Sequence, residues 1–137
     1  MRFSGSIFKD GRFWLAEVPI LEAMTQGSTK KETFEMVKDL LETLANRSDF
    51  VVTVYPGREG SFEVGSEDTR TMVRLLLRRQ REKSGLSLAD VANRLGAKSR
   101  NAYARYERGT SVPTIEKLDE LLQAVSPDQD IVFHQSR

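Results

Sequence analysis

Three glycines, Gly85, Gly96 and Gly109, divide residues 69–125 into four short segments, each with apolar residues at helical spacing. Glycine readily adopts the left-handed backbone conformation in which many helices end. Ser87 stands three residues before Asp90, and this spacing predicts a capping box at the start of the second segment. The pattern therefore predicts four short helices joined by tight turns.

These expected helices also have recognisable caps and inward faces. Ser99 is expected to cap the third helix, and Pro113 and Thr114 are expected to begin the fourth. The residues expected to face inward are Met72, Val73, Leu76, Leu77, Val91, Ala92, Leu95, Tyr103, Tyr106, Ile115, Leu118, Leu121 and Leu122. We therefore predict an all-α domain of four to five short helices over residues 67–137, with a C-terminal tail strand at residues 130–133.

The first part of the chain begins with a predicted β-hairpin. Residues 3–8 and 13–18 alternate in hydrophobicity and flank Asp10-Gly11, which offers the positive φ angles of a tight turn. One face of this hairpin is expected to need an apolar cover.

A helix over residues 29–46 is expected to supply that cover. Thr29 and Glu32 predict a capping box, and the apolar positions are Phe34, Val37, Leu40, Leu41 and Leu44. A β-branched strand is expected over residues 50–55, with a short edge strand at residues 61–64. The sequence therefore predicts an α+β protein, with a ββαβ domain at residues 1–66 and the helical domain at residues 67–137.

Positive charge is concentrated in one part of the chain, although the net charge is only +1. Residues 70–109 carry 11 basic and 3 acidic side chains, whereas residues 1–67 carry 8 basic and 11 acidic ones. A basic block of this kind is typical of a surface that faces phosphates. Surface charge runs are also common on faces that are only solvated, so the charge by itself leaves both interpretations open.

The helical region contains the segments Leu86-Ser-Leu-Ala-Asp-Val-Ala-Asn-Arg-Leu-Gly96 and Ser99 to Gly109, the latter including Tyr106-Glu-Arg-Gly, and then Pro113. In these residues the chain resembles the Cro/repressor-type (XRE-type) helix-turn-helix family over about residues 70–125. The resemblance implies that the third helix enters the major groove of operator DNA. The family often has a glutamine that contacts phosphate where this chain has Leu88, so one polar contact is missing.

The resemblance also assigns roles to individual residues. It implies that Arg100, Asn101 and Arg105 contact base edges, because arginine can bind guanine and asparagine can bind adenine with two hydrogen bonds. It implies phosphate contacts by the amide ends of the second and third helices and by Ser87, Lys98, Ser99, Arg108 and Thr110. A structural ion pair is expected between Arg81 and Glu107. One such domain covers half an operator, so a homodimer or higher homo-oligomer on a palindromic site is expected.

The first domain carries Pro19, Thr25-Gln26-Gly27 and Thr29 between the hairpin and the predicted helix. With these residues, residues 3–56 resemble the HicB-type antitoxin domain, a partial relative of the ribonuclease H fold. That resemblance implies a protein partner, a small basic HicA-type toxin that cleaves mRNA, which the antitoxin covers. It also implies autorepression of the operon, since some HicB-type antitoxins carry a C-terminal helix-turn-helix.

Catalysis by the chain itself is not expected. Metal-dependent phosphodiester hydrolysis needs several converging carboxylates, and the pattern does not bring together the candidates Asp10, Glu17, Glu22, Asp39 and Asp49. No phosphate-binding loop, nucleophile motif or metal-ligand spacing is present, and the lone His134 is expected to be an ordinary tail residue. We therefore expect no enzyme activity, catalytic residue, metal or cofactor.

Two further expectations concern ligands and location. Trp14 and Tyr55 could line a ligand pocket, which leaves open a metabolite-sensing transcriptional repressor with an N-terminal ligand-binding domain. The chain has no cysteine and no long apolar segment, so disulfides are excluded, no membrane insertion is expected and a cytoplasmic location is expected.

Overall fold

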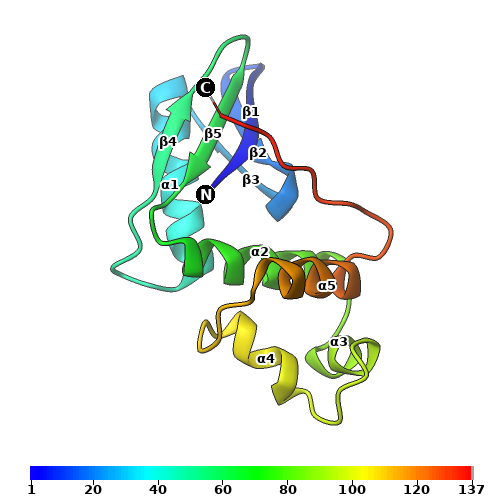
Figure 1. Ribbon diagram of the computed structural model, residues 1–137. Coiled ribbons are helices and arrows are strands. Elements are labelled where there is room, and N and C mark those ends of the chain that lie inside the picture. The colour runs from blue at the N-terminus through cyan, green and yellow to red at the C-terminus, as the bar shows by residue number, and fades with distance from the viewer. Residues whose placement is uncertain (137) are drawn as a thin grey trace. The chain divides into compact units, whose positions relative to one another are not determined.

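The structure is a computed structural model that describes residues 1–136. The chain forms two compact units, Met1–Leu76 (unit 1) and Leu77–Arg137 (unit 2). The units meet within one helix, α2 (Thr69–Lys83), so the first turns of this helix belong to unit 1 and the last turns to unit 2. The five-stranded antiparallel sheet and the long helix at residues 30–45 lie in unit 1, and the three helices that follow α2 lie in unit 2 (Figure 1).

The predicted hairpin is confirmed. It consists of β1 (Arg2–Asp10) and β2 (Phe13–Val18), and the register pairs Asp10 with Phe13 across the turn. Gly11 in the turn has φ +61°, the conformation that the Asp-Gly pair predicts.

Three further strands complete the sheet, in the order β3-β2-β1-β5-β4. They are β3 (Ala23–Gly27), β4 (Thr53–Pro56) and β5 (Ser61–Gly65). The predicted ββαβ order misses β3, where the sequence suggested a loop and a turn. A short 3-10 helix at Pro19–Leu21 reverses the chain direction. Glu22 follows it in the left-handed conformation, with φ 47°, and β3 then runs antiparallel to β2. The burial of β3 alternates, with Met24 and Gln26 exposed between more buried residues, but the residue types Ala-Met-Thr-Gln-Gly do not alternate in hydrophobicity.

The positions of β4 and β5 in the sheet also differ from the prediction. β5, expected at the edge, lies between β1 and β4 and pairs with both. Its two inward residues, Phe62 and Val64, are buried, and β4 forms the edge instead. Pairing partners far apart in the chain decide this order, and local residue type does not encode them.

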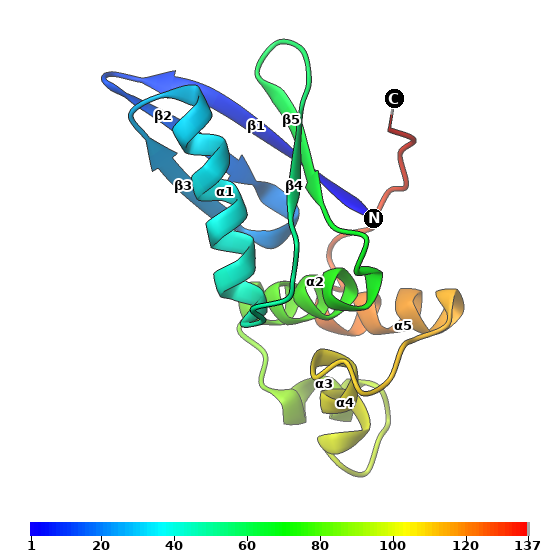
Figure 2. The same ribbon diagram turned by 90° about the vertical axis from the view of Figure 1, so that its left-hand side faces the viewer.

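The predicted helix α1 (Lys30–Ala45) covers one face of the sheet (Figure 2). The Thr29 side chain accepts a hydrogen bond from the Glu32 amide at 3.0 Å, which starts the helix. The buried stripe contains Thr33, Val37, Leu41 and Ala45, and it packs with Phe3, Ile7, Ala16 and Val18 of the hairpin in the core. The predicted stripe is therefore rotated slightly, because Phe34, Leu40 and Leu44 are only half-buried.

The four predicted helices of residues 69–125 are confirmed. After α2 come α3 (Leu88–Arg94), α4 (Asn101–Glu107) and α5 (Ile115–Val125). The three glycines that end the segments have φ angles between +70° and +76°. The core of unit 2 consists of fully buried side chains from all four helices, namely Leu77, Val91, Tyr103, Leu121 and Val125.

Two expectations for the C-terminal part are wrong. Ile115 is 68% exposed, because it lies in the first turn of α5, before the buried stripe that starts at Leu118. Residues 130–133 form no strand, and among its described residues unit 2 is helical and offers no strand edge for pairing. None of the described helices has the length and apolarity needed to cross a bilayer.

Candidate nucleic-acid interface

The turn between α3 and α4 is built by local hydrogen bonds. At the start of α3 the Ser87 hydroxyl oxygen accepts from the Asp90 amide at 3.0 Å, and the Asp90 carboxylate accepts from the Ser87 amide at 2.8 Å. At its end Gly96 has φ +72° and the Ala97 amide donates to the Ala92 carbonyl at 2.9 Å. The buried Ala92 permits close packing of the two helices.

Helix α4 has a buried face and an exposed polar face. Tyr103 and Tyr106 are buried, whereas the three residues predicted to contact bases, Arg100, Asn101 and Arg105, are exposed. Arg105 is held in place because its guanidinium lies 5.1 Å from the centre of the Tyr106 ring and donates to the Tyr106 hydroxyl at 3.4 Å. The exposed face of α4 can therefore offer hydrogen-bond donors to a groove of duplex DNA.

The residues predicted to contact phosphate are all exposed, but their hydroxyl groups differ in availability. Ser87 and Ser99 use their oxygens as acceptors for chain amides, at 3.0 and 3.2 Å, so their hydroxyl hydrogens can still donate to phosphate. Thr110 donates both its amide and its hydroxyl to the Arg105 carbonyl, each at 3.0 Å. Thr110 therefore has to break a hydrogen bond within the chain before it can bind phosphate.

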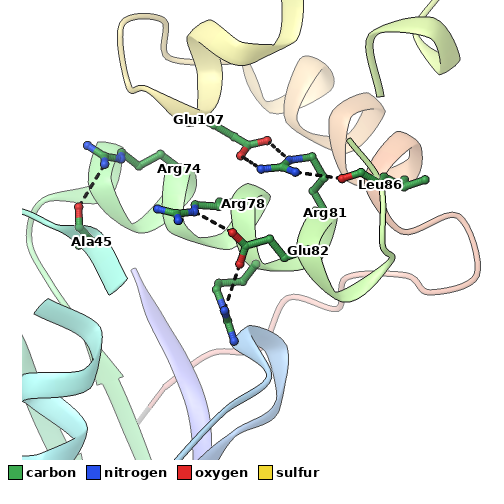
Figure 3. A network of polar contacts seen from close by, with 8 residues as sticks. Ala45, Arg74, Arg78, Arg81, Glu82, Leu86 and Glu107 are labelled. Atoms are coloured by element: carbon green, nitrogen blue, oxygen red, sulfur yellow. Dashed lines mark hydrogen bonds and ion pairs between the residues drawn. The ribbon is translucent and has the colours of Figure 1, made fainter. Parts of the chain in front are cut away.

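The predicted pair of Arg81 and Glu107 forms a bidentate ion pair between the last turns of α2 and α4 (Figure 3). Its two N–O distances are 2.7 and 2.9 Å, and a third arginine nitrogen donates to the Leu86 carbonyl at 2.9 Å. Hydrogen bonding to Glu107 raises the pKa of Arg81. Burial, together with the nearby Glu107 charge, raises the pKa of Tyr103. This cluster positions α4.

Several arginines of the basic block at residues 70–109 bind groups within the chain, and others are exposed. Arg74 donates to the Ala45 carbonyl at 3.1 Å, and both Arg78 and Arg79 pair with Glu82 (Figure 3). Arg94 donates to the Ala124 carbonyl at the end of α5 and so links α3 to α5. The sequence count could not separate these arginines from DNA-facing ones, because a charge count carries no information on side-chain partners.

Once those arginines are set aside, four exposed cations remain around the turn and α4. They are Lys98, Arg100, Arg105 and Arg108, all within eleven consecutive residues. The candidate interface is therefore smaller than the 40-residue block suggested, and it coincides with the turn and the third helix of the motif.

The residues considered for catalysis and ligand binding lie apart. Glu17 accepts from the Ser6 hydroxyl at 3.1 Å and Asp49 pairs with Arg47 at 3.2 Å. Within residues 1–136, no three histidine or acidic side chains are grouped as metal ligands would be. Trp14 on β2 shares the sheet face of the buried Ala16, whereas Tyr55 on β4 lies on the opposite face, where Arg2 stacks on its ring at 3.4 Å. The two aromatic residues do not line one pocket.

Acidic pH is expected to weaken the start of α3. The Ser87 amide, by its hydrogen bond, lowers the pKa of Asp90. Because the folded pKa lies below the unfolded value of about 3.9, the charged carboxylate stabilises the fold above that value, and this contribution is lost as pH falls through the folded pKa. Asp90→Asn should therefore lower the thermal unfolding midpoint at pH 7, and the difference from wild type should disappear in strong acid. Circular dichroism at 222 nm measures this, with Asp128→Asn in the exposed tail as control. A difference that is constant with pH would contradict the capping role.

Comparison with known proteins agrees with this geometry. Residues 77–125 match the helix-turn-helix family, from the unit 2 turns of α2 to the end of α5. No curated protein matches the chain. The helix-turn-helix assigns this region to DNA binding and transcription regulation.

Proposed function

We propose that the chain is a HicB-type antitoxin that sterically inhibits a HicA-type mRNA-cleaving ribonuclease and represses its own operon by binding operator DNA. The observation that carries the proposal is the helix-turn-helix, in which α4 exposes Arg100, Asn101 and Arg105. The antitoxin half is supported by the HicB-like residues from Pro19 to Thr29 in the attached unit 1.

In the DNA-binding step, α4 enters the major groove and its arginines and asparagine donate to base edges. Lys98, Ser87, Ser99 and Arg108 bind the flanking phosphates and set the register without reading the sequence. A homodimer presents two α4 helices to a palindromic operator, and occupation of that operator blocks transcription.

In the inhibition step, unit 1 covers the RNA-cutting surface of the toxin, and no chemistry, metal or cofactor takes part. The sheet face opposite α1 supports a protein partner, because Phe8, Phe13 and Met24 are exposed there. Large apolar side chains exposed on one face of a sheet are typical of protein interfaces. The excess of acidic residues in residues 1–67 suits a basic partner.

Operator binding is expected to weaken steeply with salt. Each phosphate neutralised by a cation releases counterions, so affinity should fall by about tenfold or more between 50 and 200 mM salt. Lys98→Ala should make the slope of log Kd against log salt shallower by about 1 for each subunit of the bound dimer, whereas Lys9→Ala, on β1, should leave it unchanged. Fluorescence anisotropy with labelled operator measures both slopes. A complex insensitive to salt would contradict the electrostatic part of the proposal.

The antitoxin half is tested by capture of the protein encoded next to this chain. A tagged full-length chain should copurify with a small basic protein and should abolish its RNA cleavage. Arg100→Ala should leave this inhibition intact, because Arg100 lies on the DNA face of unit 2. If no neighbour is retained, or if Arg100→Ala abolishes retention, the proposed division of labour is wrong.

A further inference from the structure

The edge of the sheet in unit 1 presents an unpaired, strand-forming segment. In the ladder that the structure describes, β4 pairs with β5 and has no neighbour on its other side. Val51 and Val52 precede β4, and Val51 is 72% exposed. An open edge with β-branched residues is a ready template for another strand. Neither DNA binding nor the exposed apolar sheet face accounts for this edge.

A cationic groove of about 340 Å³ lies beside this edge, between α1 and β4, which run next to each other in Figure 2. Phe34, Val54 and Pro56 give it an apolar part. Its charged residues are Lys30, Lys31, Lys38 and Glu35, of which Lys38 and Glu35 pair at 3.0 Å. With three lysines against one glutamate, the groove favours a segment that is both acidic and apolar.

The C-terminal tail has these two properties. Asp128 and Asp130 precede Ile131-Val132-Phe133, and Val132 and Phe133 are 84% and 79% exposed. The Asp130 carboxylate accepts from the Gln123 side chain at 3.0 Å, which anchors the start of the tail to α5. The following residues have the β-branched and aromatic composition of a strand but no strand partner in the described structure.

We propose that the tail of a second copy of this chain adds to β4 as a sixth strand. Backbone hydrogen bonds to the open edge give the pairing, and Val132, on the same face of the added strand as Asp128 and Asp130, covers Phe34 and Val54. The aspartates of the tail lie near the lysines of α1 and fix its direction. Since each copy has one tail and one groove, two copies exchange tails reciprocally in a closed dimer. This contact needs neither DNA nor toxin, so it is independent of the function proposed above.

The absence of cysteine allows a direct cross-linking test. One copy carries Thr53→Cys on β4, and a second copy with a different tag carries Gln135→Cys in the tail. A short bismaleimide should join the two copies in a mixed dimer. Gln26→Cys on β3, at the other edge of the same sheet, is the matched control and should give little product. All three positions are exposed, so folding should be preserved, which circular dichroism verifies.

Charge reversal makes the test specific to the groove. Lys31→Glu with Lys38→Glu in the Thr53→Cys copy should abolish the cross-link at that groove, and Asp128→Lys with Asp130→Lys in the Gln135→Cys copy should restore it. Absence of the mixed dimer, or equal product from Gln26→Cys, would overturn the proposal. So would a single chain with both Thr53→Cys and Gln135→Cys that cross-links only within itself at high dilution, since the tail would then occupy its own sheet.

Discussion

Glu107→Ala is expected to lower the free energy of unfolding of the helix-turn-helix by about 3 kcal/mol. The side chains of Arg81 and Glu107 are only 16% and 8% exposed, so removal of the carboxylate leaves a largely buried guanidinium without its partner. That loss is a large share of the stability of a small domain. Urea denaturation followed at 222 nm measures it. Operator affinity should fall as well, because the pair holds the end of α4.

The control for this prediction is Glu120→Ala, which removes the partner of Lys117 in a pair with side chains 35% and 53% exposed. This change should cost less than about 1 kcal/mol, because exposed pairs contribute little. The double variant Arg81→Met with Glu107→Leu should recover much of the stability, since no unpaired charge remains. If Glu107→Ala proved as mild as Glu120→Ala, the ion pair would not be what positions α4.

Arg105→Ala is expected to raise the operator Kd by about 10- to 100-fold for each half-site that the dimer occupies, since one bidentate arginine–guanine contact contributes about 1–3 kcal/mol of discrimination. The variant removes a side chain that Tyr106 already orients, so little ordering is lost on binding. Arg100→Ala should have an effect of the same kind. Anisotropy titration of operator and scrambled DNA measures both affinity and specificity.

Two variants test whether Arg105 acts through hydrogen bonds to a base or only through its positive charge. Arg105→Lys keeps the charge but loses the paired donors and should recover only part of the affinity. Arg58→Ala, in the turn between β4 and β5, should leave operator binding unchanged. An equal loss on operator and scrambled DNA would mean that Arg105 binds phosphate and does not contact a base.

Much of the helical half could be predicted from sequence because its signals are local. The capping box of Ser87 and Asp90 and the left-handed Gly85, Gly96 and Gly109 act within one helical turn. These positions lie within residues 77–125, which match the helix-turn-helix family. The hairpin was predictable for the same reason, since Asp10-Gly11 acts on its own backbone.

The features that the sequence did not reveal depend on partners far along the chain. Edge strand β3 pairs through its backbone, and β5 takes its inner place by pairing with β1. The arginines of the basic block look alike in sequence, yet Arg74 and Arg94 bind carbonyl groups distant in the chain.

The sequence alone therefore determined the helices, the caps of α3 and α5 and the hairpin, because these depend on hydrogen bonds and backbone conformations within a few residues. The predicted Ser99 cap is wrong, because α4 begins after Arg100 without a side-chain cap. Only the tertiary structure decided the strand order, the four exposed cations around the turn and α4, and the exposure of Ile115 and the tail. Those outcomes depend on which groups meet after folding, and residue type does not carry that information.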